Sequence, residues 1–304
     1  MQWFFIALGA PFLWALVNLS DQYLVANYSR GRRGSGGLVL FSSLIGIFVA
    51  VAIAIFTDGV FNIPILDKVL LITTGGITIA WVILYLFTIE IEDISAVVPW
   101  FLTIPIFGYA FGYIFLGETL TNQQLIGSAI ILLGVFLISI DFSGVKRQIK
   151  WLPAFYMIVA CILISIAGVI FKYVTVENNF WVSSFWEYAG LGGFGILLYL
   201  FVPKYREEFM LMNRQGGIKI FSLNTASEVL TIVGNLLTNY AILLAPVTMV
   251  YLVGSFQPAI VLFLTLFTTK FFPNIAKEDT KERILLPKII AIVIMIVGSA
   301  ILFL

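Results

Sequence analysis

Long apolar stretches, separated by short polar or Gly/Pro breaks, recur along all 304 residues of the chain. Each stretch holds about 20 residues, which as a helix is enough to cross the roughly 30 Å hydrocarbon layer of a membrane. No stretch alternates with period 2 as a barrel strand would, and helices satisfy their own backbone groups in hydrocarbon. The pattern predicts ten spanning helices, which begin near Trp3, Gly37, Val69, Ile94, Gln123, Pro153, Phe180, Lys219, Val247 and Pro287.

Composition agrees with an all-α polytopic membrane protein. Hydrophobic residues make up 61% of the chain and charged residues 11%, with a mean hydropathy of +1.07. Soluble domains are only about half apolar. The stretch after Trp3 lacks a basic n-region and a small-residue cleavage site, so we interpret it as the first spanning helix and not as a signal peptide. The expected location is the cell membrane, crossed many times.

Missing residue types exclude several functional classes. The chain has no histidine, which removes His-based metal sites and His-dependent nucleophiles. Its single cysteine, Cys161, lies in an apolar stretch and is interpreted as a core residue. The net charge is +1 and no basic tract contains interleaved aromatic residues, so no nucleic-acid partner is expected. We expect no metal, no cofactor and no enzymatic activity.

The two halves of the chain look like copies of one unit. A shift of 153 residues places Pro105 on Pro258 and Thr78 on Thr231. Because each copy would hold five spanning helices, an odd number, the second copy would be inverted relative to the first.

This arrangement predicts ten transmembrane helices in two inverted five-helix repeats, residues 1–142 and residues 143–304. Inverted repeats are typical of secondary transporters, which use two symmetry-related states around one central site. Pro105 and Pro258 fall at matching points of the fourth helix of each repeat, and both are predicted hinges.

A family resemblance is carried by PIFGYAFGYIFLGETLTNQQLIGSAIILLGVFLI, residues 105–138, and less strongly by LWALVNLSDQYLV from Leu13 and FWVSSFWEYAGL from Phe180. These segments resemble EamA-like proteins of the drug/metabolite transporter (DMT) superfamily. The resemblance implies a secondary transporter, often an exporter, with its substrate in a central cavity lined by both repeats. In one departure, the second repeat has Thr269, Lys270 and Phe271 where the first has Gly117, Glu118 and Thr119.

The Gly117-Glu118 turn is predicted to be structural. Glu118 stands between two apolar stretches, where a carboxylate can cap the free N–H groups at the start of the following helix.

A polar stripe runs along the predicted eighth helix. At 100° per residue its members fall within an arc of about 80°; they are Asn224, Glu228, Thr231, Asn235 and Asn239. A charge at mid-depth facing lipid costs on the order of 3 kcal/mol, so the stripe should face the interior of the bundle or a wet cavity. An interhelical hydrogen-bond seam is the alternative interpretation.

The third helix carries a second stripe with Thr78, Trp81 and Tyr85 at helical spacing. Together with Glu228, Thr231, Asn235 and Asn239 these residues form the predicted substrate site. Glu228 and Glu187, which lie inside apolar stretches, are the predicted coupling residues for a proton. Lys172 ends its stretch, where it can either snorkel to the interface or pair with a glutamate across the cavity.

The apolar stretches hold no arginine, so strongly anionic substrates are not expected. The predicted function is a secondary active transporter, exporter or exchanger, of a small polar or aromatic metabolite, coupled to protons or a counter-substrate and present as a monomer or homodimer. Two alternatives remain. A membrane enzyme acting on a lipid-linked substrate would use the acids of Glu90–Asp93 to hold magnesium, and a structural membrane subunit would need no polar interior.

Charge predicts the orientation in the membrane. Of the 17 lysines and arginines, all but Lys68 and Lys172 fall on or beside the odd-numbered connections between the ten helices. The positive-inside rule therefore places the odd connections in the cytoplasm and both termini outside. Many members of the resembling family are thought to have both termini inside, so the two arguments disagree.

Overall fold

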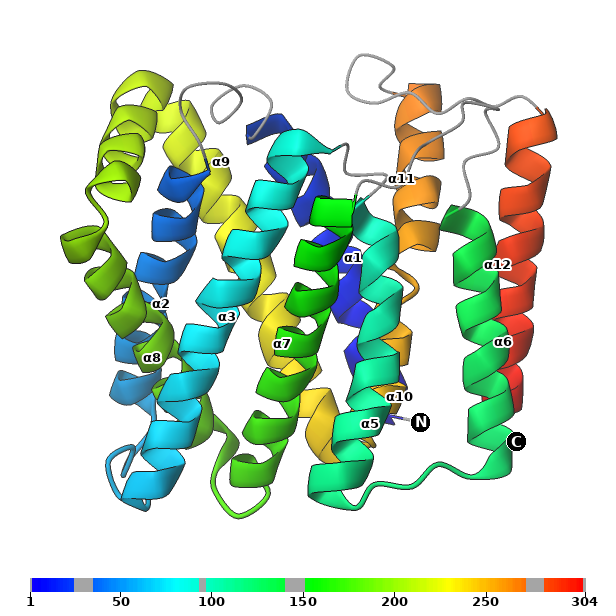
Figure 1. The fold of residues 1–304 in the computed structure, drawn as a ribbon, viewed down its shortest axis with the longest axis horizontal. Helices are drawn as coiled ribbons and strands as arrows, with labels where there is room; N and C mark the ends of the chain where they lie inside the picture. The colour runs from blue at the N-terminus through cyan, green and yellow to red at the C-terminus, as the bar shows by residue number, and fades with distance from the viewer. Residues whose placement is uncertain (1, 25–34, 93–96, 140–150, 272–281, 303–304) are drawn as a thin grey trace.

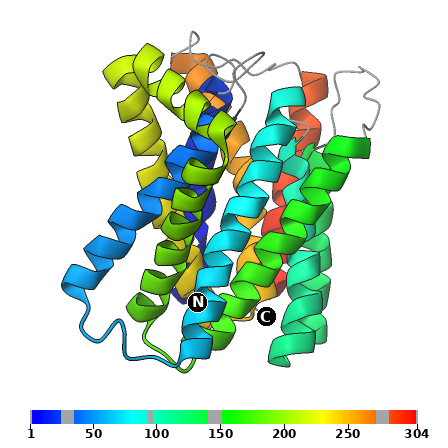
Figure 2. The same cartoon turned by 60° about the vertical axis from the view of Figure 1, so that its left-hand side comes forward.

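The computed structural model describes residues 2–24, 35–92, 97–139, 151–271 and 282–302. Within these ranges the chain forms eleven α-helices and one 3-10 helix, with no strand. The helices stand side by side in one bundle, with both termini at the same end (Figures 1 and 2). They are α1 (Gln2–Leu24), α2 (Gly36–Phe56), α3 (Ile65–Ile91), η2 (Val98–Thr103), α5 (Ile104–Leu116), α6 (Asn122–Ser139), α7 (Trp151–Thr175), α8 (Phe180–Phe201), α9 (Pro203–Leu244), α10 (Val247–Gly254), α11 (Gln257–Phe271) and α12 (Glu282–Leu302).

Each of the ten predicted stretches corresponds to a helix or to a pair of consecutive helices. Among the described residues, five helices are long and apolar enough to cross a membrane, or six if α8 and the start of α9, bent by 100°, form one span. Four further apolar helices are shorter, between Gln2 and Asn18, Trp100 and Leu116, Asn122 and Leu137, and Leu285 and Ile301. The chain is therefore a helical multi-pass membrane protein, while the exact count of ten crossings stays a prediction.

The helices of the two halves pack in corresponding pairs. When each helix of a packed pair is replaced by its counterpart in the other half, the result is again a pair that packs together. If α1, α2, α3, η2–α5 and α6 correspond to α7, α8, α9, α10–α11 and α12, then α3 packing on α7 matches α1 packing on α9. In the same way, α3 on α8 matches α2 on α9, while α2–α8 and α6–α12 map onto themselves. Two related halves would give this arrangement. The inverted relation and the boundary near residue 142, which lies outside the described residues, stay predictions.

The seventh connection is helical, which the sequence did not predict. α9 starts at Pro203, not near Lys219, and bends at Gly217, where φ is +56°. A positive φ of this kind is readily adopted only by glycine. Glu208, in the first part of α9, accepts a hydrogen bond at 2.9 Å from the backbone N–H of Gly36, the first residue of α2. The extra helical segment thus caps a helix of the first half.

Small residues allow close helix contacts in the GLGGFG segment of α8, residues 190–195. A Cβ on Gly190 would lie 2.4 Å from the carbonyl oxygen of Ile72 on α3. One on Gly195 would lie 2.7 Å from Oγ of Ser43 on α2. α8 therefore packs closely between α2 and α3. Glu187, on the same helix, lies toward the centre of the bundle.

Candidate functional site: a central polar cavity

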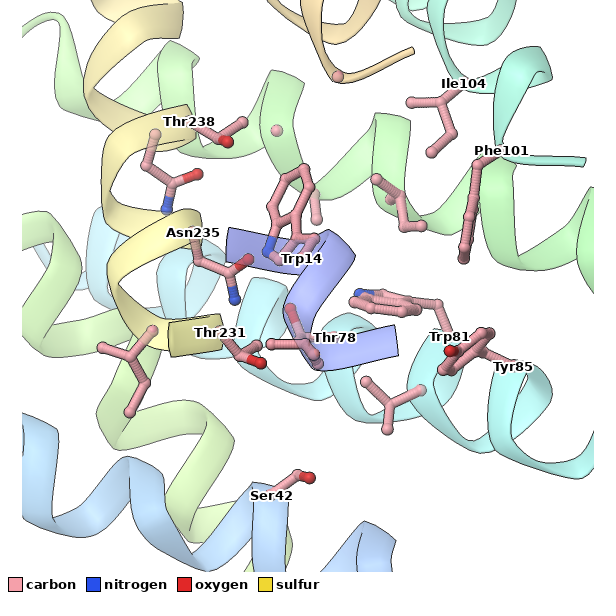
Figure 3. Close-up of a pocket in the computed structure, with 18 of the residues that line it drawn as sticks. Trp14, Ser42, Thr78, Trp81, Tyr85, Phe101, Ile104, Thr231, Asn235 and Thr238 are labelled. Atoms are coloured by element: carbon pink, nitrogen blue, oxygen red, sulfur yellow. The ribbon is translucent and has the colours of Figure 1, made fainter. Parts of the chain in front are cut away.

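A cavity of about 250 Å³ lies at the centre of the bundle. Its wall is built by α1, α2, α3, η2 and α5 from the first half and by α7, α8, α9, α10 and α11 from the second. Figure 3 shows side chains from several of these helices converging on it. The cavity thus joins the two halves of the chain, as the resemblance implied.

The polar stripe of α9 faces this cavity. All five of its predicted members line the wall, and Thr238 joins them. Residues on other faces of the same helix are apolar and exposed, for example Val229 at 49% and Val233 at 42%. Because a helix turns 100° per residue, spacings of three and four keep the stripe on one side and these valines on another. The structure thus places the stripe at a polar cavity and not at the lipid-facing surface.

The opposite wall is largely aromatic. Thr78, Trp81 and Tyr85 of α3 all line the cavity, as predicted. The ring centroids of Trp81 and Tyr85 are 6.4 Å apart, and those of Tyr85 and Phe101 are 5.7 Å apart. Trp14 of α1 adds a further ring and lies between this group and Asn235 in the view of Figure 3. Thr78 and Thr231, the repeat equivalents, therefore belong to one cavity.

Two carboxylates reach the cavity wall, Glu187 from α8 and Glu228 from α9. Oε2 of Glu187 accepts a hydrogen bond from Nδ2 of Asn239 at 2.8 Å. Glu228 accepts a short hydrogen bond from the hydroxyl of Ser42. Neither carboxylate forms an ion pair with a described residue, and no lysine or arginine is among the lining residues. The predicted coupling residues are thus acidic groups compensated only by neutral donors.

Sequence reasoning missed many residues of the wall, among them Trp14, Asn18 and Ser42. Trp14 and Asn18 stand four apart on α1, and Ser42 lies on α2. Asn18 is 8% exposed; its Oδ1 accepts a hydrogen bond from the Tyr85 hydroxyl at 3.4 Å, while its Nδ2 is buried without a partner. The i, i+4 spacing of Trp14 and Asn18 was a usable signal. Nothing local distinguishes Ser42 from the neighbouring Ser43, which points away and bonds the carbonyl of Leu40.

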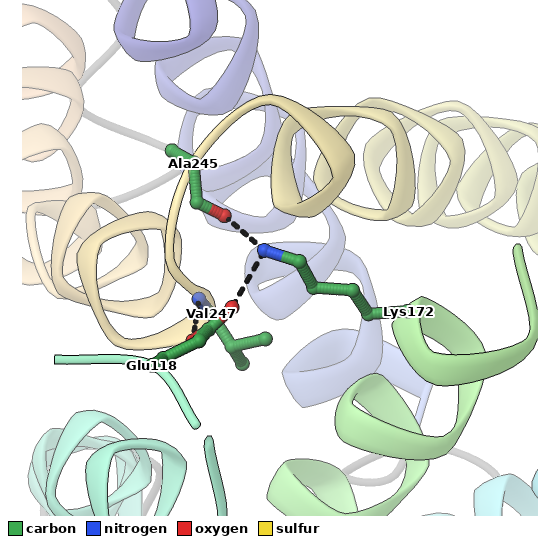
Figure 4. A network of polar contacts seen from close by, with 4 residues as sticks. All are labelled: Glu118, Lys172, Ala245 and Val247. Atoms are coloured by element: carbon green, nitrogen blue, oxygen red, sulfur yellow. Dashed lines mark hydrogen bonds and ion pairs between the residues drawn. The ribbon is translucent and has the colours of Figure 1, made fainter. Parts of the chain in front are cut away.

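Glu118 does not cap the helix that follows it, which corrects the prediction. Gly117 ends α5 with φ at +64°, as a glycine turn requires. Oε2 of Glu118 then accepts a hydrogen bond at 2.8 Å from the N–H of Val247, the first residue of α10 in the other half (Figure 4). α6 is capped instead by Thr121 and Gln124, which exchange hydrogen bonds of 3.2 and 2.9 Å.

Lys172 completes this junction outside the cavity. Its Nζ lies 2.6 Å from Oε1 of Glu118 and donates to the carbonyl oxygen of Ala245 at 2.7 Å. Lys172 does pair with a glutamate, but at this junction and not across the cavity. Figure 4 shows the four residues meeting where α5, α7, α9 and α10 end or begin. Lys172 is therefore neutralised by Glu118 and does not line the cavity.

The two predicted hinge prolines do not interrupt continuous helices. Pro105 is the second residue of α5, directly after η2, and Pro258 is the second residue of α11, directly after the break between α10 and α11. Prolines in a first turn remove no intrahelical hydrogen bond, because the N–H there has no partner in the helix. The breaks still lie at matching points of the two halves, and Pro258 lines the cavity. Hinge motion at either proline stays a prediction.

The acidic segment that a membrane enzyme would need is only partly described. Glu90 lies near the C-terminus of α3, while Asp93 lies outside the described residues. Within the described ranges, no group of three or more Cys, Asp or Glu residues has the spacing of a metal site.

Comparisons with known proteins give the fold and then the family. Among solved structures, 28 chains are similar; one crystal structure has a TM-score of 0.69, covering 99% of this chain and 95% of its own, at 16% identity. That identity supports the fold alone. No curated protein sequence matches the chain. The sequence profile of the EamA-like transporter family matches residues 1–140. Over its first 140 residues this multi-pass membrane protein is thus similar to the EamA-like transporter family.

Proposed function

We propose that the protein is a secondary active transporter that moves a small polar or aromatic metabolite across the cytoplasmic membrane, as an exporter or exchanger. The observation that carries the proposal is the central cavity, which combines a polar face on α9 with an aromatic face on α3. Buried polar groups in a membrane span are costly, and they are typical of substrate and ion pathways.

The packing of the helices supports alternating access as the mechanism. The pairs α3–α7 and α1–α9 are interchanged by exchange of the halves, and the cavity lies between them. A bundle of this kind has two equivalent ways to open, one toward each side of the membrane. The Glu118–Lys172 junction lies at the end of the bundle that carries the connections α5–α6, α7–α8 and α9–α10 (Figures 1 and 4). Opening this end would require the junction to separate.

The carboxylates provide the coupling in this proposal. Glu228 and Glu187 have no cationic partner among the described residues, so each can exchange its compensating proton or cation as the cavity changes sides. The substrate contacts would come from Thr78, Trp81 and Tyr85 on one wall and from Thr231, Asn235 and Asn239 on the other.

A flux experiment with a mixture of candidate solutes tests the proposal. Purified protein in proteoliposomes is given a defined mixture of amines, amino acids, nucleosides, sugars and organic acids, with a proton gradient in either direction, and the contents are measured by mass spectrometry. At least one solute should accumulate above empty liposomes. Thr78→Val should reduce this accumulation, whereas Thr73→Val should not, because Thr73 lies on the same helix but is exposed and bonds only the carbonyl of Val69. A structural subunit would move no solute.

A further inference from the structure

The charge balance of the cavity points to the kind of solute it takes. Among the described lining residues, Glu187 and Glu228 are the only carboxylic acids, and there is no lysine or arginine. A carboxylate in an apolar interior must gain a proton or a cation, because an isolated charge there costs far more than its hydrogen bonds return. Among the described residues neither group has a cationic partner, and Lys172 is held by Glu118 and Ala245 outside the cavity.

The hydrogen bonds of the two carboxylates leave acceptor capacity unused. A carboxylate has four lone-pair positions. Glu187 receives the Asn239 amide on Oε2, and Glu228 receives the Ser42 hydroxyl on Oε1. One oxygen of each group thus has no hydrogen-bond donor among the described residues. An ammonium group, which carries three donors and no acceptor, is complementary to a carboxylate oxygen that lacks a donor.

The aromatic wall suits the rest of such a molecule. Trp14, Trp81 and Phe101 present ring surfaces to the cavity, and Trp81 and Tyr85 are in tilted contact. Ring faces attract cations and also cover apolar carbon. The cavity volume is about 250 Å³, whereas an engineered cavity of about 150 Å³ holds benzene. A single ring with a short aminoalkyl chain therefore has room.

A second polar feature lies on the aromatic side. Nδ2 of Asn18 is a buried donor without a partner, although the same side chain lines the cavity and its Oδ1 is occupied by the Tyr85 hydroxyl. Buried donors in native structures are nearly always satisfied, and a bound molecule is one way to satisfy them. In Figure 3, Trp14 and Thr78 lie between Tyr85 and the α9 side chains Asn235 and Thr238. Asn18 itself is bonded to Tyr85 of the aromatic wall.

We propose that the cavity binds an organic cation, an ammonium group on an apolar or aromatic body, with the ammonium at Glu187 or Glu228 and a hydrogen-bond acceptor of the molecule at Asn18. The inference rests on the proposed function, because it names the class of solute that the same cavity would carry. Organic anions are disfavoured because the lining residues include two acidic groups and no lysine or arginine, and neutral solutes would leave the acceptor oxygens without their strongest partner.

The test compares molecules that differ only in charge. Thermal stability of the purified protein is measured with phenethylamine, with its neutral analogue 2-phenylethanol and with the anion 3-phenylpropanoate, and then with further primary, secondary and quaternary amines, each beside a matched alcohol. A ligand that binds the folded state raises Tm. We expect amines to raise Tm in a saturable manner and their matched alcohols and acids to have little effect. The proposal is wrong if no amine exceeds its neutral analogue.

Variants locate the binding site. Glu228→Gln or Glu187→Gln, whichever removes the carboxylate that holds the ammonium, should weaken amine binding by about tenfold or more, because a charge-assisted hydrogen bond is replaced by a neutral one. Glu207→Gln is the matched control, since Glu207 is exposed on the first part of α9 and away from the cavity. Equal amine binding by all three variants would place the cation elsewhere and overturn the proposal. If a glutamine variant does not fold, the comparison of amine with alcohol on the wild-type protein still decides.

The same preparation separates this inference from the proposed function. If amines stabilise the protein but no solute crosses the membrane in proteoliposomes, the cavity binds cations and the transport proposal fails. If a neutral or anionic solute is transported while no amine binds, the protein is a transporter and the cation inference fails.

Discussion

Nζ of Lys172 lies 2.6 Å from Oε1 of Glu118, and the two side chains are only 14% and 12% exposed. The pair joins the end of α5 in the first half of the chain to the end of α7 in the second. Through Val247 and Ala245 it also holds the junction of α9 and α10. Oε1 of Glu118 contacts the Lys172 ammonium, Oε2 accepts from the N–H of Val247, and Nζ of Lys172 donates to Ala245. Such contacts offset the loss of hydration of a buried ion pair.

Removal of one member of the Glu118–Lys172 pair should therefore lower the free energy of unfolding. Lys172→Met leaves the Glu118 carboxylate buried beside only one N–H donor, and we expect a loss of about 3 kcal/mol in the free energy of unfolding. Thermal unfolding in detergent measures the effect as a lower Tm. Lys204→Met is the control: the Lys204 side chain is 76% exposed and its distance to Glu208 is 3.9 Å, so little change is expected. An equal effect of both substitutions would show that the Glu118–Lys172 pair does not stabilise the junction.

Packing of α8 predicts opposite effects of one substitution at two glycines of the same helix. Gly190→Ala places a Cβ 2.4 Å from a backbone oxygen of α3, and should lower stability by about 1–3 kcal/mol through overpacking. Gly193→Ala meets nothing within 4 Å, and should be neutral or stabilising because alanine favours helix by up to about 1 kcal/mol. The two Tm values, measured in the same detergent, check the prediction. Equal tolerance of both changes would contradict the tight α3–α8 contact.

Coupling to a gradient should depend on the cavity carboxylates. In Glu228→Gln and Glu187→Gln the side chain resembles the protonated acid but cannot release a proton. We expect gradient-driven accumulation in proteoliposomes to be abolished in at least one of them, with exchange of labelled substrate for unlabelled substrate less affected. Full gradient dependence in both variants would remove the coupling role, while Glu207→Gln should behave like the wild type.

Orientation in the membrane can be measured at two exposed positions. Lys204 lies on the seventh connection and Asp58 on the second, and both are exposed. In a Cys161→Ala background, the charge bias predicts that Lys204→Cys resists a membrane-impermeant thiol reagent in intact cells and that Asp58→Cys is labelled. Labelling in permeabilised cells shows that both cysteines are reactive. The reverse pattern would establish that both termini are inside.

The polar face of the cavity was predictable because it is a local property of one helix. The residues of the α9 stripe share a face by periodicity alone, and a face that carries a glutamate and three asparagines must avoid lipid. The same holds for Thr78, Trp81 and Tyr85 on α3. Ten apolar stretches likewise predict helices, because hydrocarbon leaves the backbone few other solutions.

Contacts between distant segments could not be obtained in this way. Glu118 was expected to cap α6, its own neighbour, but Thr121 and Gln124 meet that need locally and Glu118 reaches α10, 129 residues away. Asn18 and Ser42 look ordinary in their own helices, and they become parts of the cavity only because α1 packs on α9 and α2 on α8 and α9. The order of residues is enough to assign the polar faces of the helices, since the backbone sets the helical period. Which of those polar atoms meet, and which stay unpaired like Nδ2 of Asn18, follows only from the folded bundle, because a donor's partner depends on how all the helices pack.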